Sequence, residues 1–323
     1  MLERTRGRAT DAGYAAGWGL IKAVPKPLSE RWFRAAADAA TVRNGGGTQQ
    51  LRKNLRRVVG PSVSELQMDQ LVGDALRSYS RYWLETFRLS KMDLRDVAAR
   101  ADLGVVGEEN VRAALDRGKG AILALPHSGN WDVAGVWLVS KHGQFTTVAE
   151  RLKPESLFNR FVEYRESLGM EVIALTGGDV PPTQILADRL RANKIVCLLS
   201  DRDLSRNGVP VDFFGEPTRM PPGPSLLAAM TGAAVLPTHA YFTPRGWGLT
   251  IRPPVELRGE RLRDQVTSGT QQVADAFAEE IAKHPADWHM LQRLWLADLT
   301  PRTDDESSPA PRSSMSTRFT GRR

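Results

Sequence analysis

From about residue 101 onward, short apolar runs alternate with longer segments whose apolar residues recur every three or four positions. The short runs predict buried strands, and the longer segments predict helices. Strands are expected at 121–126, 145–149, 171–175, 195–200, 210–214, 234–242 and 247–252. Helices are expected at 130–141, 155–168, 182–192, 224–231 and 264–283. Regular alternation of this kind favours an α/β fold in which helices flank a central, mostly parallel β-sheet.

The first hundred residues carry only helical patterns. Helices are expected at 10–24, from about 29 to the glycines at 45–47, at 51–59 and at 64–90. The chain is therefore divided into an N-terminal helical segment packed on the core (1–100), an α/β core (101–300) and a disordered tail rich in Ser, Pro and Arg (301–323). The helix at 51–59 is amphipathic and basic, and we interpret it as a solvated surface helix in preference to one that lies on anionic lipid.

The strand expected at 121–126 is followed by the motif His-Ser-Gly-Asn-Trp-Asp. We expect catalytic residues at this strand end. Asn130 can cap the following helix, which places Asp132 in its first turn, where unpaired N–H groups favour a carboxylate. If the turn folds back, Asp132 can orient the ring of His127. An imidazole oriented in this way is suited to act as a general base. The alternative is that both residues only shape the strand end and the helix start.

A second candidate site follows the strand expected at 195–200. There the sequence changes from apolar residues to three charged ones, Asp201-Arg202-Asp203. If the two strands are neighbours in the sheet, Asp201 can also contact His127. Asp132 and Asp201 are therefore rival or joint partners of the imidazole. Arg202 can bind an anionic group or pair with Asp203.

Charge and composition restrict the class of partner. The 44 basic residues exceed the 37 acidic ones, giving a net charge of +7, and most of the basic residues are arginine. Phospholipid head groups and phosphate-bearing substrates fit this excess better than nucleic acid, because the aromatic and basic spacing of nucleic-acid-binding motifs is missing. The sequence also lacks the long apolar stretch of a signal peptide or a bilayer-spanning helix, so we expect any membrane contact to be peripheral.

Several other chemistries lack their motifs. There is no G-x-S-x-G elbow, no P-loop and no G-x-G-x-x-G. The remaining histidines lack the spacing of a metal site, so no metal is expected. Cys197, the single cysteine, sits in an apolar run, where it is expected to be a small buried residue and not a nucleophile.

The motif His127-Ser128-Gly129-Asn130-Trp131-Asp132 resembles the HxxxxD signature of the bacterial lipid A and phosphatidylinositol mannoside acyltransferases. Later blocks follow in the family's order: Phe213-Phe214-Gly215, the Gly-Pro helix start at 223, and Thr231-Gly232-Ala233. The resemblance covers about residues 100 to 298. It implies that Glu150 and Arg165 help to form the substrate cleft. The resembled enzymes commonly have glutamate where this chain has Asp201.

The resemblance implies acyl-coenzyme A-dependent transfer of a fatty acyl chain, with palmitoyl favoured, to a mannose hydroxyl of a phosphatidylinositol mannoside. His127 would be the general base, with Asp132 and Asp201 as the other catalytic residues. Asn130, Glu150, Arg165, Arg202 and Asp203 are the expected substrate-binding residues. No permanently bound cofactor is expected, and the protein would work on the cytoplasmic face of the plasma membrane. A lipid A-type or other glycolipid acceptor, or a non-catalytic binder of anionic lipid, are the alternatives.

Overall fold

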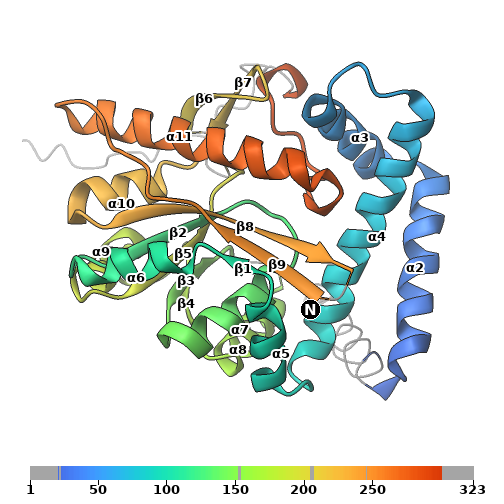
Figure 1. Cartoon of the computed structure of the whole chain (residues 1–323), viewed down its shortest axis with the longest axis horizontal. Coiled ribbons are helices and arrows are strands. Elements are labelled where there is room, and N and C mark those ends of the chain that lie inside the picture. Colours follow the sequence, from blue (N-terminus) through green and yellow to red (C-terminus); the bar gives the residue numbers. More distant parts are fainter. Residues whose placement is uncertain (1–20, 22, 152–153, 204–206, 245, 300–323) are drawn as a thin grey trace, which may run out of the picture.

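A seven-stranded sheet forms the centre of the computed structural model, which describes residues 21, 23–151, 154–203, 207–244 and 246–299 (Figure 1). From edge to edge the strands are β1 (Val105–Val106), β9 (Gly246–Ile251), β8 (Ala234–Thr243), β2 (Ala121–Leu125), β5 (Ile195–Leu199), β3 (Thr146–Ala149) and β4 (Glu171–Ala174). All neighbours are parallel except β8 and β9. The predicted α/β fold with a mostly parallel sheet is confirmed.

Helices cover both faces of this sheet (Figure 1). They are α6 (Glu108–Asp116), α7 (Trp131–His142), α8 (Glu155–Ser167), α9 (Pro182–Arg191), α10 (Gly223–Thr231) and α11 (Leu262–Lys283). The side chains of β2 alternate between two cores: Leu123 packs in the core that includes α7, and Ile122 in the one that includes α10 and α11. Burial on both faces explains why β2 is apolar at every position, as the strands of parallel sheets usually are.

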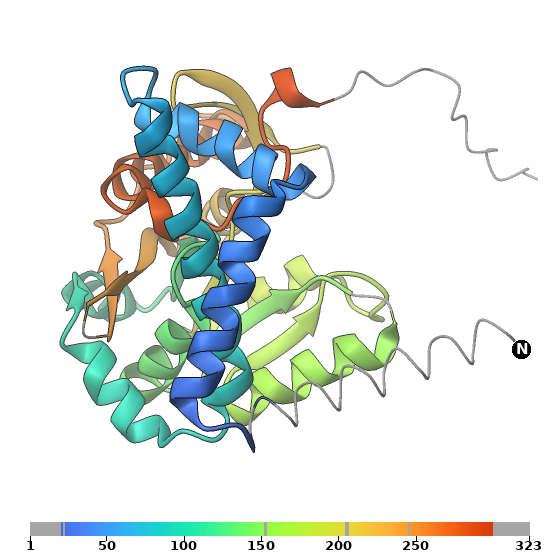
Figure 2. The same cartoon turned by 90° about the vertical axis from the view of Figure 1, so that its right-hand side faces the viewer.

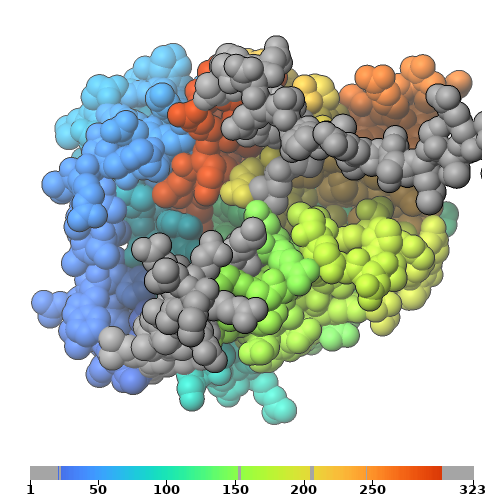
Figure 3. Space-filling model, turned by 180° about the vertical axis from the view of Figure 1, so that it is seen from behind, coloured from blue at the N-terminus to red at the C-terminus, as the bar shows by residue number. Residues whose placement is uncertain are grey.

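In the described part of the chain, four helices precede the main part of the sheet: α2 (Lys26–Arg43), α3 (Gly46–Val59), α4 (Glu65–Leu89) and α5 (Leu94–Asp102). α2 and α4 lie side by side in both cartoon views (Figures 1 and 2). A capping box between Ser64 and Gln67 fixes the start of α4. Seen from behind, the blue N-terminal helices and the green segment that includes α8 stand on opposite sides of the face, with part of α4 visible deeper between them (Figure 3).

The glycines at 45–47 do not end a helix as predicted; the helix before them ends earlier. Asn44 adopts a left-handed conformation, with φ of 47°, and its N–H closes the end of α2 on the carbonyl of Ala40. Gly45 is then the N-cap of α3, and Gly46 begins it. An asparagine tolerates the left-handed region well enough to take the position expected for glycine.

Several short elements were not predicted from the pattern. These are α5, β1, α6, strand β7 (Glu216–Met220) and the 3-10 helices η1 (Pro285–Asp287) and η2 (Leu296–Asp298). The strand predicted at 210–214 is present as β6 (Val209–Phe213), but it pairs with β7 in a separate two-stranded antiparallel sheet. The strands β1 and β7 and the two 3-10 helices are too short to show a clear period in the sequence.

The basic side chains of α3 are largely paired within the protein. Arg52 forms ion pairs with Asp69 and Glu65 at the start of α4. Arg57 lies 2.8 Å from Asp298, and its guanidinium also stacks over Trp295. These contacts support the interpretation of α3 as a surface helix that packs on the protein, and they leave less of its charge for lipid.

The expected helix at 10–24 lies almost entirely outside the described residues, and the tail at 301–323 does so completely. Within the described part of the chain, no helix combines the length and the apolar character needed to cross a bilayer. The division into 1–100 and 101–300 stays a prediction.

Candidate active site

The site is built at the adjacent ends of strands β2 and β5. The two strands are parallel neighbours, and their last residues, Leu125 and Leu199, lie opposite each other. His127 and Asp201 each follow two residues later, so the register of the sheet brings them together. Nδ1 of His127 lies 2.6 Å from Oδ1 of Asp201. The two strands are therefore neighbours, which was the condition for this contact, and Asp201 is the carboxylate that contacts the imidazole.

The carboxylate of Asp201 is fully buried and receives three hydrogen bonds. Its Oδ2 accepts from the backbone N–H of His127 and from the indole N–H of Trp288, both at 3.0 Å. Burial by itself would raise the pKa of Asp201, but the charge and hydrogen bonds of His127 outweigh it and lower that pKa. The group is therefore an ionised acceptor, and the proton of the short contact belongs to Nδ1 of His127.

This tautomer has a direct chemical consequence. With the proton on Nδ1, Nε2 carries the lone pair that can accept a proton from another molecule. The His127 side chain is 29% exposed, whereas its partner Asp201 is fully enclosed. The ring also meets Trp131 edge to face, with 5.8 Å between the centroids. The ring is therefore oriented by Asp201 on one side and partly exposed, an arrangement that would suit a general base.

Asp132 does not orient His127, which corrects that part of the sequence interpretation. Its Oδ1 accepts a hydrogen bond from Nε of Arg165 at 3.0 Å, and its Oδ2 lies 3.4 Å from the hydroxyl of Tyr82. Helix α7 starts at Trp131, and this carboxylate contacts side chains of α4 and α8. Burial opposes the charge of Arg165, but the Asp132 carboxylate more than offsets this and raises the pKa of Arg165.

Asn130 caps α7 as predicted: its Oδ1 accepts from the N–H of Val133 at 3.1 Å. Its Nδ2 donates to Glu85 of α4 at 2.7 Å, and the side chain is buried. The same Glu85 oxygen accepts from the indole of Trp247. Because both ends of the amide are bound inside the protein, Asn130 holds the turn in place, and its predicted contact with substrate stays a prediction.

Gly129 lets the turn lie directly against strand β8. Its φ is 56°, and a Cβ there would fall 2.5 Å from the backbone of Ala240. Its N–H donates to the carbonyl of Asp287, and the carbonyl of His127 accepts from the N–H of His289. The sequence reasoning missed this supporting segment, because nothing in the local pattern at 287–289 points to a turn 160 residues earlier.

The other predicted site residues lie after strands β3 and β5. Arg202 lies 3.5 Å from Glu150, so these two predicted substrate-binding residues form a partly exposed ion pair. The carboxylate of Asp203 accepts from the N–H of Gly208 at 2.6 Å. Their predicted contacts with substrate stay predictions. Among the described residues, no group of three or more His, Cys, Asp and Glu side chains is placed to hold a metal ion.

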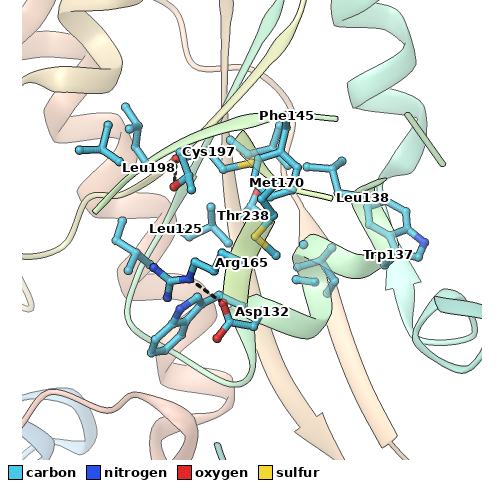
Figure 4. Close-up of a pocket in the computed structure, with 18 residues that line it drawn as sticks. Leu125, Asp132, Trp137, Leu138, Phe145, Arg165, Met170, Cys197, Leu198 and Thr238 are labelled. Carbon is cyan, nitrogen blue, oxygen red and sulfur yellow. Dashed lines mark hydrogen bonds and ion pairs between the residues drawn. The ribbon is translucent and has the colours of Figure 1, made fainter. Parts of the chain in front are cut away.

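An apolar pocket lies between the sheet and helix α7, directly below the ends of β2 and β5. Leu125 and Leu199 line it, and so does Trp131, which touches His127. The Asp132–Arg165 pair lies at one end of this pocket, and Phe145 and Met170 lie toward the other (Figure 4). Cys197 is in the wall, where burial raises the pKa of its thiol, as suits the small apolar residue that we predicted.

Comparison with known proteins shows the family to which this chain belongs. The model of the bacterial lipid A biosynthesis acyltransferase family matches residues 4–297. The chain belongs to this family. It is therefore an O-acyltransferase, and the segment at 127–132 lies within the matched residues.

Two relatives of this acyltransferase are similar over nearly its whole length. A phosphatidylinositol mannoside acyltransferase of Mycolicibacterium smegmatis is 54% identical over 294 residues, which cover 91% of this chain and 94% of the relative. A protein of the same name from Mycobacterium tuberculosis is 54% identical over 292 residues, or 90% of each chain. The similarity therefore includes the N-terminal helices as well as the sheet.

Proposed function

We propose that this acyltransferase transfers a fatty acyl chain, with palmitoyl favoured, from acyl-coenzyme A to a mannose hydroxyl of a phosphatidylinositol mannoside. The observation that carries the proposal is the 2.6 Å contact between His127 and the buried carboxylate of Asp201, in a chain that matches the acyltransferase family. The names of the mycobacterial relatives support the acceptor.

In the proposed reaction, Nε2 of His127 accepts the proton of the mannose hydroxyl as the oxygen attacks the thioester carbonyl. A tetrahedral intermediate forms and collapses, the C–S bond breaks, and coenzyme A leaves as a thiolate that takes the proton from the imidazolium. Asp201 stabilises the imidazolium while it exists. The base activates the acceptor directly, so the reaction needs no acyl-enzyme.

The negative oxygen of the intermediate needs a donor, and the backbone of the turn offers few. The N–H of His127 donates to Asp201, that of Ser128 to the carbonyl of Pro126, and that of Gly129 to Asp287. Arg165 is held by Asp132. We therefore assign the role to Arg202, whose contact with Glu150 at 3.5 Å is long enough to be exchanged for substrate.

The apolar pocket is the proposed site of the acyl chain. Its walls include leucine, phenylalanine and methionine side chains, and it begins beside Trp131, the ring that contacts His127. The open volume is about 50 Å³, so a long chain must displace side chains to enter. Met170 is suited to move, because methionine has three rotatable side-chain bonds and fills irregular gaps.

Both proposed substrates carry lipid, so we propose that the enzyme works on an anionic membrane surface, at the cytoplasmic face of the plasma membrane. The net charge of +7 supports this. Leu28 and Trp32 of α2, four residues apart and so on one face, are both exposed. Co-sedimentation with anionic liposomes at low salt, weakened at high salt, is the expected result. Failure to sediment at low salt would remove this part of the proposal.

A lipid A-type acceptor and a carrier that binds anionic lipid without turnover are the alternatives. The test is release of coenzyme A from palmitoyl-coenzyme A by wild type and His127→Ala, with phosphatidylinositol dimannoside present or omitted. Release that requires both His127 and the acceptor supports the proposal. Release without the acceptor indicates a thioesterase. No release, with lipid binding retained in His127→Ala, indicates the carrier or a different acceptor.

A further inference from the structure

The indole of Trp288 lies behind the His127–Asp201 pair. Its N–H donates to Oδ2 of Asp201 at 3.0 Å, and the side chain is completely buried. The residue belongs to the segment between η1 and η2, and the resemblance that identified the other site residues did not point to it. Trp288 is also paired with Ser128 in an isolated antiparallel bridge.

We propose that Trp288 is a positioning residue for the acyl-transfer reaction, which holds the carboxylate of Asp201 in the orientation that His127 requires. The inference rests on the proposed role of His127 as the general base. Oδ2 is held by two donors, the N–H of His127 and the Trp288 indole, so Oδ1 is directed at Nδ1. Without the indole, one donor remains on Oδ2, and the carboxylate can rotate.

The segment that carries Trp288 is itself fixed on both sides. The carbonyl of Asp287 accepts from Gly129, and the N–H of His289 donates to the carbonyl of His127 at 2.8 Å. The side chain of Asp287 accepts from the hydroxyl of Ser78 in α4 and from the N–H of Phe242 in β8. Trp288 therefore joins the turn, the helix α4 and the sheet to one oxygen atom of Asp201.

Among the described residues, the titratable group in contact with this carboxylate is His127, from the turn after β2. His289, from the same segment as Trp288, lies next to His127. Burial lowers the pKa of His289 to about 3, so this ring is neutral wherever the enzyme is folded and active. The indole N–H thus competes with His127 for the negative charge of Asp201. Its removal should leave more of that charge to stabilise the imidazolium.

The chain offers a matched control. Trp295 is also completely buried, its indole N–H donates to the carbonyl of Phe213 at 3.0 Å, and its ring, like that of Trp288, packs on Phe213. Trp288→Phe and Trp295→Phe each remove one buried indole hydrogen bond. Of the two lost bonds, the one from Trp288 is the bond accepted by Asp201. Both variants should lose similar thermal stability.

The experiment measures kcat, KM and the pH profile of acyl transfer for wild type, both tryptophan variants and His127→Ala. For Trp288→Phe we expect kcat to fall about tenfold, the size of a lost hydrogen bond to a charged group, with KM for acyl-coenzyme A unchanged. The acid limb of its kcat profile should also move to higher pH. Trp295→Phe should keep the kcat and the profile of wild type.

Equal kcat and equal pH profiles in the two tryptophan variants, with His127→Ala inactive, would overturn the proposed role of Trp288. The proposed role of His127 as the base would then still stand. Activity retained in His127→Ala would instead overturn the proposed base. If Trp288→Phe does not fold, β-(3-benzothienyl)alanine at position 288 gives the same test. It keeps the two-ring shape and replaces the N–H with sulfur, and the same replacement at 295 is its control.

Discussion

The ring of His127 is held by Asp201, 74 residues away in sequence, and not by Asp132, five residues away in the same motif. The contact of 2.6 Å between Nδ1 and Oδ1 depends on the parallel pairing of β2 and β5. Asp132 forms a buried ion pair with Arg165 instead. The two carboxylates should therefore respond differently to removal of their charge.

Asp201→Asn is expected to reduce kcat by about a hundredfold or more, since an amide can present its N–H to Nδ1 and stabilise the wrong tautomer of the base. Steady-state acyl transfer at pH 7 measures this. Asp188→Asn, an exposed surface change on α9, is the control and should match wild type. A kcat for Asp201→Asn within threefold of wild type would contradict the assignment of the orienting carboxylate.

Asp132→Asn should act mainly on stability. It leaves the guanidinium of Arg165 buried without its ionic partner, which costs about 3 kcal/mol in the free energy of unfolding. Urea denaturation measures the loss. The double variant with Arg165→Met removes the stranded charge and should recover part of the stability. An Asp132→Asn protein as stable as wild type would show that the pair does not support the fold.

Gly135→Ala should restrict the apolar pocket. A Cβ at this position falls 2.3 Å from Cε of Met170 and 3.2 Å from the ring of Phe145, so the methionine must move into the space proposed for the chain. We expect the kcat/KM for palmitoyl-coenzyme A to fall several-fold more than that for octanoyl-coenzyme A. Gly73→Ala is the control, because its Cβ meets only Thr41 at 3.9 Å. Equal effects on both chain lengths would place the acyl chain elsewhere.

The buried His239 should make the protein sensitive to acid. Desolvation, helped by the charges of His284 and Lys283, lowers the pKa of His239 from 6.5 to about 3 in the folded state. Between those values the unfolded chain binds a proton that the folded protein excludes, so stability is complete above pH 6.5 and falls as the pH drops toward 3. The slope is about 1.4 kcal/mol per pH unit for one group. His239→Phe should unfold with a shallower pH dependence in urea titrations between pH 6.5 and 4.5, and identical slopes would contradict this.

Much of the site followed from the sequence because it depends on periodicity and strand ends. The apolar runs before His127 and Asp201 predicted two strands, and parallel strands in one sheet place their following residues at the same edge. The choice between Asp132 and Asp201 could not be made, because it depends on which way the first turn of α7 rotates its carboxylate. That rotation is set by contacts with Tyr82 and Arg165, on helices that the motif does not include.

The supporting shell could not be predicted at all. Trp288, Glu85 and Ser78 reach the site through packing of segments far apart in sequence, and each looks locally like an ordinary core or surface residue. Asn130 illustrates the same limit: its position predicted a cap, which is present, but its contact with Glu85 comes from the docking of α4. The pattern of a single sequence predicts individual helices and strands. It does not predict the side-chain contacts that form when these elements pack together.

The most direct test of the account is mass spectrometry of the glycolipid after incubation with palmitoyl-coenzyme A and either wild type or His127→Gln. If His127 is the base that activates the mannose hydroxyl, wild type will produce phosphatidylinositol mannoside carrying one additional palmitoyl group, and folded His127→Gln will produce almost none. The same acylated product formed by His127→Gln at the wild-type rate would contradict the account.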